Sequence, residues 1–178
     1  MNRILLVDDE PNVLSALKRL LAQAFHNEGL VIETFADARA ALARGKEVPF
    51  DMVLSDFRMP IMDGVTFLKQ FRELQPDTPR LILSATTDFD TLMAAVNEAA
   101  ILRYLVKPWD EDELIASLRE ALAHHADVVG DRLLANQMRE NMGLISEEEK
   151  ELRRLEVLEP GITQVRRSPD GAILLDDL

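Results

Sequence analysis

The sequence contains no cysteine, which excludes disulfide bridges, thiol catalysis and thiolate metal sites. It also lacks a long apolar run near its start, where the segment Ile4 to Val7 is too short for a signal peptide or a membrane span. We therefore expect the protein to reside in the cytoplasm.

Basic residues are scarce beside acidic ones. The chain carries 20 Lys and Arg against 32 Asp and Glu, a formal net charge of -12. The acidic excess is larger in residues 111–178, with 8 basic and 16 acidic residues, than in residues 1–110, with 12 and 16. Such a surface repels phosphate backbones and anionic lipids, so neither nucleic acid nor a membrane is an expected partner.

Short apolar runs alternate with helical patterns along most of the chain. The runs predict strands at residues 4–7, 31–35, 48–55, 81–83 and 103–106. Helices are predicted from residue 11 to a stop at 27–29, then at 37–45, 65–74 and 89–100, and a long helix is expected from Asp110. This alternation predicts an α/β fold, a doubly wound five-stranded parallel sheet with right-handed crossovers and a helical C-terminal extension.

The stretch from Asp51 to Gly64 carries the clearest functional pattern. Met52 to Leu54 read as a strand buried on both faces, and Asp56 stands where this strand ends. An aspartate at a strand end often only caps a turn. In a doubly wound sheet, however, the strand ends meet at one edge, which brings together a set of polar residues: Asp8, Asp9, Asp56, Ser84 and Lys107.

This set predicts phosphoryl chemistry. Carboxylates about 4 Å apart repel by roughly 4 kcal/mol at an effective dielectric of about 20, so a group of them needs a cation or a proton. If it is a cation, oxygen ligands favour Mg²⁺. If Asp8 and Asp9 hold the ion, Asp56 can attack phosphorus and form an acyl phosphate. Lys107 and the Ser84 hydroxyl would then contact the phosphoryl oxygens. The simpler alternatives are that Lys107 neutralises the acids and that Ser84 caps a helix.

Four motifs resemble the receiver domain of bacterial two-component response regulators. They are V-D-D-E at residues 7–10, S-D-F-R-M-P-I-M-D-G at 55–64, L-S-A at 83–85 and Y-L-V-K-P-W at 104–109. The resemblance covers residues 1 to about 125 and implies the flavodoxin-like strand order 2-1-3-4-5.

The resemblance implies chemical roles for individual residues. Asp56 would accept a phosphoryl group from a histidine kinase or a phosphotransfer protein. Mg²⁺ would be held by Asp9, Asp56 and the main-chain carbonyl of Arg58, with Asp8 acting partly through water. The protein would then be a switch and not an enzyme, with only self-phosphorylation from phosphodonors and self-dephosphorylation.

The resemblance also implies a conformational change. Ser84 would move toward the phosphoryl oxygens, and Tyr104 would fill the space that it leaves. Residues 89–100, which are poor in large side chains, are the expected moving element. Arg58 and Thr86 would tune hydrolysis of the phosphorylated state, and the Lys107–Pro108 peptide would be cis.

We assign the receiver-like part to residues 1–125. Two further segments follow it. Residues 126–143 are predicted to form a helical linker whose apolar stripe suggests a homodimer, although Gly130 weakens it and no strict heptad is present. Residues 144–178 are predicted to form a tail with a helix capped at Ser146 and a hairpin around residues 168–171. His124 and His125 are expected at the surface. The tail carries no motif for binding DNA or for catalysis, so the expected output is contact with a downstream protein.

Three other interpretations fit parts of the sequence. The chain could be a fragment of a larger response regulator whose effector domain is missing. It could be a receiver-like interaction module that is not phosphorylated, although its full set of acids and its lysine argue against this. A Mg²⁺-dependent aspartyl phosphatase would carry a second acid two residues after its nucleophile, where this chain has Arg58.

Overall fold

The protein was analysed as a computed structural model, which describes residues 2–85, 99–142 and Leu155. Five parallel strands form one sheet in the order β2-β1-β3-β4-β5, so the predicted fold class and strand order are confirmed. The strands are β1 (Arg3–Val7), β2 (Val31–Phe35), β3 (Met52–Asp56), β4 (Arg80–Ser84) and β5 (Arg103–Val106). The helices are α1 (Pro11–Ala24), α2 (Ala38–Glu47), α3 (Gly64–Leu74) and α5 (Glu111–Asn141).

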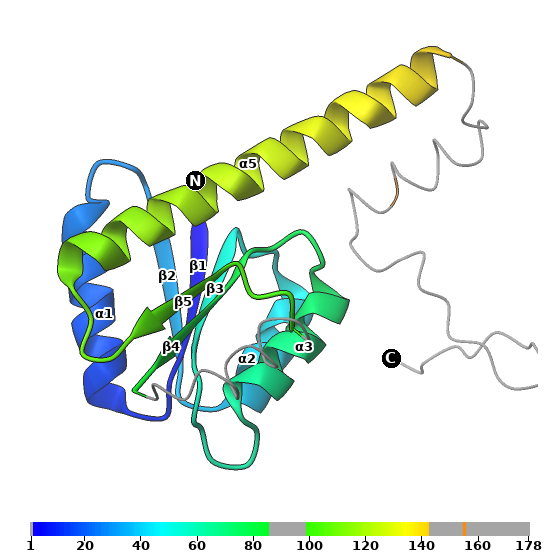
Figure 1. Ribbon diagram of the computed structural model, residues 1–178. Coiled ribbons are helices and arrows are strands. Elements are labelled where there is room, and N and C mark those ends of the chain that lie inside the picture. The colour runs from blue at the N-terminus through cyan, green and yellow to red at the C-terminus, as the bar shows by residue number, and fades with distance from the viewer. Residues whose placement is uncertain (1, 86–98, 143–154, 156–178) are drawn as a thin grey trace, which may run out of the picture. The chain divides into compact units, whose positions relative to one another are not determined.

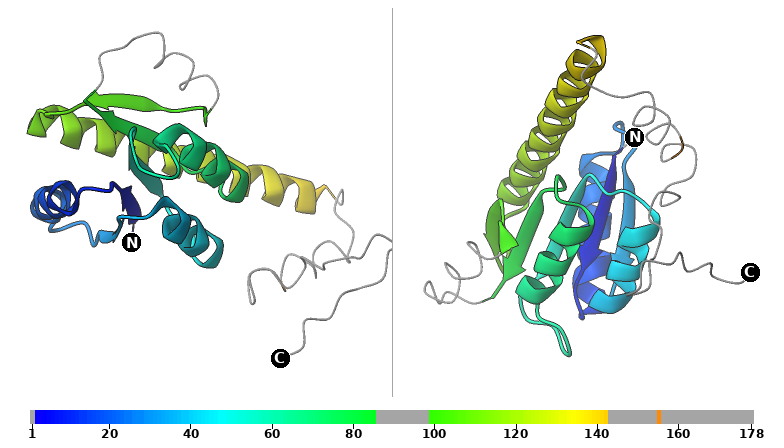
Figure 2. Two further views of the ribbon diagram at one scale, coloured as in Figure 1. Left: turned by 90° about the horizontal axis from the view of Figure 1, so that it is seen from below. Right: turned by 90° about the vertical axis from the view of Figure 1, so that its right-hand side faces the viewer.

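Helices cover both faces of the sheet (Figure 1). On one face, α1 and α5 pack against the sheet through a buried cluster that includes Leu17, Leu54 and Leu118. On the other face, α2 and α3 lie side by side (Figure 2) and bury a second cluster around Phe67 and Phe71. The sheet is therefore enclosed, and its long apolar runs are explained because β3 and β4 are buried at every residue.

Local signals in the sequence set several helix ends. Pro11 occupies the first turn of α1, where its missing N–H costs nothing. The Asp37 side chain accepts a hydrogen bond from the Arg39 N–H at 2.9 Å and caps α2. Asp63 accepts a hydrogen bond from the Thr66 N–H at 2.8 Å and caps α3. Asp37 and Asp63 thus fix the first turns of α2 and α3.

Five strand boundaries differ from the prediction, all by one residue except the start of β3, and side-chain contacts explain two of them. β3 begins at Met52 and not at residue 48, because main-chain groups of Val48 and Phe50 bind the side chain of Gln75 instead of a neighbouring strand. β4 begins one residue earlier than expected, at Arg80, whose charged side chain is buried. Apolar periodicity cannot place either boundary, because polar side chains from other segments decide both.

The chain divides into two units, residues 1–130 and 131–178. Of the second unit, the structure describes the last turns of α5, Met142 and Leu155. The apolar stripe of α5 is buried at Leu118 and Leu122, whereas Val129 and Leu133 are exposed. The domain boundaries and the homodimer remain predictions. The helix expected at 89–100, of which only Ala99 and Ala100 are described, lies largely outside the described residues, as do the tail helix from Ser146 and the hairpin.

No helix among the described residues is long and apolar enough to cross a membrane.

Candidate functional site

The carboxyl ends of the strands meet at one edge of the sheet. Parallel pairing places Val7 beside Ser55, Asp56 beside Leu83, and Ser84 beside Val106. The segments that follow β1, β3 and β5 therefore start from the same edge, and they contribute the polar residues of the site.

The side chain of Lys107 joins two of these segments. Its Nζ donates hydrogen bonds to Asp8 Oδ2 at 2.7 Å and to Asp56 Oδ1 at 2.5 Å, and Glu10 Oε1 lies 3.9 Å away. Asp8 and Asp56 are only 2% and 7% exposed, so the contact is between a largely buried ammonium and two buried carboxylates. The structure thus brings together residues that are 99 positions apart in the sequence.

Main-chain donors hold the other oxygens of the two aspartates. The N–H of Glu10 donates to Asp8 Oδ1 at 2.9 Å, and the N–H of Arg58 donates to Asp56 Oδ2 at 2.7 Å. Each carboxylate is therefore fixed at both oxygens, by Lys107 on one side and by its own loop on the other. These contacts fix the orientation of the Asp56 carboxylate.

Burial and charge have opposing effects on the pKa values in the site. Burial raises the pKa of Asp8, and the hydrogen bond from Lys107 only partly offsets this. Burial also disfavours the Lys107 ammonium, but the hydrogen bonds and charges of Asp56 and Asp8 outweigh it and raise the pKa of Lys107. Lys107 is thus held in its charged form between the two acids.

The loop after Asp56 turns back tightly on its own strand. The N–H of Gly64 donates to the Phe57 carbonyl at 2.9 Å, and a Cβ on Gly64 would lie 2.0 Å from the main-chain oxygen of Asp56. Only glycine fits this close approach. Ile61, in the same loop, is 81% exposed with a φ of 71°, a conformation that a β-branched residue rarely adopts.

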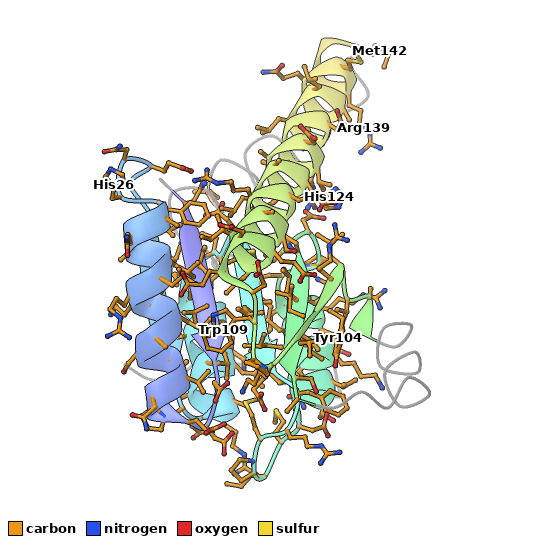
Figure 3. The ribbon with its side chains drawn as sticks, turned by 60° about the vertical axis from the view of Figure 1, so that its left-hand side comes forward. His26, Tyr104, Trp109, His124, Arg139 and Met142 are labelled. Atoms are coloured by element: carbon orange, nitrogen blue, oxygen red, sulfur yellow. The ribbon has the colours of Figure 1, made fainter. Side chains whose placement is uncertain are left out.

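Tyr104 and Trp109, labelled in Figure 3, flank Lys107 in the chain and pack on opposite faces of the sheet. Trp109 contacts the cluster beneath α1 and α5, and Tyr104 contacts the cluster beneath α2 and α3. Ser84 is 1% exposed, and its carbonyl accepts a hydrogen bond from the Lys107 N–H at 2.8 Å. The Lys107–Pro108 peptide is cis, as the resemblance implied.

The acids of this edge suit a hard divalent cation. Asp8, Asp9 and Asp56 with Lys107 leave a formal charge of -2, and all the side-chain ligands on offer are oxygens. Among the described residues, no group of three His, Cys, Asp or Glu side chains is arranged to hold a metal ion. Lys107 contacts oxygens of both Asp8 and Asp56 in this arrangement. The carboxylate donors are of the type that Mg²⁺ prefers, while in this arrangement Lys107 brings Asp8 and Asp56 together.

The remaining residues named from the sequence are Thr86, Arg58, His124 and His125. Thr86 lies outside the described residues, and the Arg58 side chain is exposed. His124, labelled in Figure 3, is exposed as expected. His125 is not simply a surface residue, because its side chain is 15% exposed and its Nδ1 lies 3.3 Å from Asp51 Oδ1.

Comparison with known proteins identifies one family. The chain matches the model of the response regulator receiver domain over residues 4–119. It is 41% identical over 119 residues to the hydrogenase transcriptional regulatory protein HoxA of Cupriavidus necator, covering 67% of this chain and 24% of that protein. It is 37% identical over 121 residues to the DNA-binding transcriptional regulator NtrC of Salmonella typhimurium, covering 68% and 25%. The chain thus spans about a quarter of the length of these relatives.

Solved structures give the same result. The signal receiver domain of an HD domain-containing protein from Pseudomonas fluorescens superimposes with a TM-score of 0.67 at 35% identity, covering 72% of this chain and 92% of that chain. A structure titled adenylate cyclase, from Rhodopirellula baltica, superimposes with a TM-score of 0.69 at 32% identity, covering 76% and 98%.

Proposed function

Because this chain belongs to the response regulator receiver family, we propose that Asp56 accepts a phosphoryl group and that the modified protein changes its protein contacts. The observation that carries the proposal is the shared Lys107 ammonium, which holds the buried Asp56 carboxylate at the edge of the sheet. A side chain so placed can meet the oxygens of an incoming phosphoryl group and offset their charge.

The proposed reaction is a displacement at phosphorus. A carboxylate oxygen of Asp56 forms the new bond to phosphorus, while the bond to the donor breaks and its electron pair leaves with the donor's imidazole or carboxylate. Asp8, Asp9, Asp56 and the carbonyl of Arg58 would hold Mg²⁺, which when bound supplies positive charge to the phosphoryl oxygens. Lys107 keeps its proton and stabilises the same oxygens.

Ser84 and Tyr104 are proposed to transmit the change. Ser84 is buried at the end of β4, and Tyr104 is half-buried on the neighbouring strand β5. The added charge of about -1.5 to -2 would attract the Ser84 hydroxyl, and Tyr104 would respond to the space that this opens. Arg58 and Thr86 are proposed to tune the hydrolysis rate.

The proposed phosphodonor is a histidine kinase or a phosphotransfer protein in the cytoplasm. The proposed output is contact with a downstream protein, with a homodimer through α5 as one form of it. The relatives named above are transcriptional regulators, but this chain spans only about a quarter of their length. The similarity therefore supports phosphorylation of a receiver domain and no further activity of those regulators. The chemistry is limited to its own phosphorylation from donors and its own dephosphorylation.

The test is the intact mass of the protein after incubation with acetyl phosphate, with and without Mg²⁺. We expect a gain of one phosphoryl group that requires Mg²⁺ and is absent in Asp56→Asn. Asp127→Asn, which changes an exposed carboxylate on α5, should gain the group normally. If the folded, Mg²⁺-saturated protein gains nothing, or if Asp56→Asn gains as much as the unchanged protein, the proposal is wrong.

A further inference from the structure

Ser55 is a buried polar residue directly before Asp56 in β3. It is 0% exposed, and the residues beside it in the two adjacent strands are Val7 and Ile82, which are each 1% exposed. Val7 and Ile82 belong to the cluster beneath α2 and α3, so the Ser55 hydroxyl lies on an apolar face of the sheet. A buried hydroxyl costs free energy unless it is hydrogen-bonded, so its partner calls for an explanation.

The Ser55 hydroxyl donates a hydrogen bond to the main-chain carbonyl of Asp56, with Oγ 2.9 Å from the carbonyl oxygen. Pairing between β1 and β3 extends as far as Val7 and Ser55, so this carbonyl lies just beyond the end of that ladder. Gly64 approaches the same oxygen closely, because a Cβ there would lie 2.0 Å from it. The serine therefore supplies a donor to a carbonyl that lies between the end of a ladder and a tight loop.

The peptide group between Asp56 and Phe57 is consequently held at both of its polar atoms. Its carbonyl accepts from Ser55, and its N–H, which belongs to Phe57, donates to Leu83 O at 2.9 Å. Because a peptide group is planar, these two contacts set the direction in which the chain continues. The next main-chain N–H is that of Arg58, which donates to Asp56 Oδ2 at 2.7 Å. The orientation of the Asp56–Phe57 peptide thus sets where the Arg58 main chain lies relative to the Asp56 carboxylate.

We propose that Ser55 is a positioning residue for Asp56, because its hydroxyl orients the Asp56–Phe57 peptide and so places the Arg58 main chain beside the Asp56 carboxylate. The Arg58 N–H then holds Oδ2 while Lys107 binds Oδ1. A carboxylate held at both oxygens meets phosphorus in one orientation, which increases the rate of attack. The effect on rate rests on the proposed function, whereas the placement of Arg58 does not.

The test compares Ser55→Ala with Thr78→Val, a matched change at another buried hydroxyl. Thr78 is 3% exposed, its Oγ1 donates to Phe50 O at 2.8 Å, and it lies before β4, at the edge of the sheet opposite to Asp56. Both variants lose a hydroxyl that binds a main-chain carbonyl, so both are expected to lose stability in a denaturant titration. Only Ser55→Ala changes a contact of Asp56.

Two measurements on the full chain distinguish a positioning role from a structural one. NMR hydrogen exchange of the Arg58 amide reports the placement of the main chain, and intact mass over time reports the rate of phosphorylation by acetyl phosphate with Mg²⁺. Ser55→Thr is the conservative variant, since it keeps the hydroxyl. If Ser55→Ala does not fold, Ser55→Cys carries the test, because a thiol is only a weak donor.

We expect exchange of the Arg58 amide to be about tenfold faster in Ser55→Ala, and phosphorylation about tenfold slower, because the Asp56 carbonyl loses its donor and the peptide is free to turn. Thr78→Val should match the unchanged protein in both measurements, even at an equal loss of stability. Ser55→Thr should restore both values.

The proposal is overturned if Ser55→Ala and Thr78→Val show the same Arg58 exchange, or if Ser55→Thr comes no closer to the unchanged protein than Ser55→Ala. Faster Arg58 exchange with an unchanged rate of phosphorylation would overturn the role of Ser55 in the reaction. Failure of the proposed function gives a different result, because the unchanged, folded, Mg²⁺-saturated protein would then gain no phosphoryl group. Exchange of the Arg58 amide would still decide whether Ser55 places the Arg58 main chain.

Discussion

At the scale of the residue, Lys107 explains how two acids can be buried side by side. Carboxylates about 4 Å apart repel by roughly 4 kcal/mol at an effective dielectric of about 20, which is a large fraction of the stability of a domain. One ammonium within 2.7 Å of both offsets this repulsion. Asp8 and Asp56 therefore share the Lys107 ammonium as their counterion.

Gly64 permits the tight loop beside Asp56, and we expect Gly64→Ala to disrupt it. The added Cβ would lie 2.0 Å from the Asp56 carbonyl oxygen, a clash with backbone that side-chain motion cannot relieve. We expect a loss of about 3 kcal/mol in the free energy of unfolding, measured by denaturant titration, together with slower phosphorylation by acetyl phosphate.

Gly130→Ala is the matched control, since a Cβ there would meet nothing within 4 Å. It should leave phosphorylation unchanged and stabilise the helix by up to about 1 kcal/mol. Equal stability losses in the two variants would contradict the role of the close approach at Gly64.

At the scale of the element, Glu33 connects β1, β2 and α2. It forms ion pairs with Arg3 and with Arg44, and the Arg44 Nε lies 2.8 Å from Glu33 Oε2. The hydrogen bond from Arg44 is the main cause that lowers the pKa of Glu33 below its usual value, and burial only partly opposes it. The charged form of Glu33 therefore stabilises the folded state.

We expect Glu33→Gln to lower the free energy of unfolding by about 1 kcal/mol at pH 7, the size typical of a partly exposed ion-pair network. Because the folded pKa is depressed, this stabilisation is present above the unfolded value of about 4.5 and is lost as the pH falls through the folded pKa. Denaturation at pH 7 and at pH 3 measures the difference. If the difference in free energy of unfolding between the unchanged protein and Glu33→Gln stays constant with pH, this explanation is wrong.

The elements were predictable from the sequence to the extent that apolar periodicity defines them. Strands β2 and β5 match the predicted bounds, and α5 ends at Asn141, near the end of the helical linker predicted over residues 126–143. The strand order came from the resemblance and not from the pattern, because five alternating units can be wound in more than one order. The convergence of Asp8, Asp56 and Lys107 did not need that order, because the carboxyl ends of parallel strands in a doubly wound sheet meet at one edge.

The contacts that could not be predicted are those of polar side chains with distant main-chain groups. Gln75 and Arg80 look like ordinary residues of a loop and a strand start, yet each binds carbonyls that lie about 20 or more positions away. One signal was available for Arg80, since a charged residue directly precedes the apolar run Leu81 to Leu83. Its partners could not be inferred, because every residue has a main-chain carbonyl and the sequence does not indicate which of them accepts a side-chain hydrogen bond.

At the scale of the whole molecule, all the described core residues belong to the first unit, residues 1–130. Among the described residues, neither buried cluster includes a residue beyond Leu122, although α5 continues to Asn141. Leu133, Leu134 and Met138 are each more than half exposed. The described residues of α5 beyond Leu122 therefore add no side chain to the two buried clusters and contribute little to the stability of the sheet.

We accordingly expect a chain that ends at Gly130 to fold and to keep its free energy of unfolding within about 1 kcal/mol of the full protein, since none of the described core side chains is removed. Denaturant titration of both proteins at equal concentration measures this, and acetyl phosphate should modify both to the same extent. A loss of several kcal/mol, or a dependence of stability on protein concentration in the full chain alone, would show that residues 131–178 support the fold. A dependence of stability on protein concentration would favour the predicted homodimer, because only association makes stability depend on concentration. A loss of stability without such a dependence would instead indicate a tail that docks on its own domain.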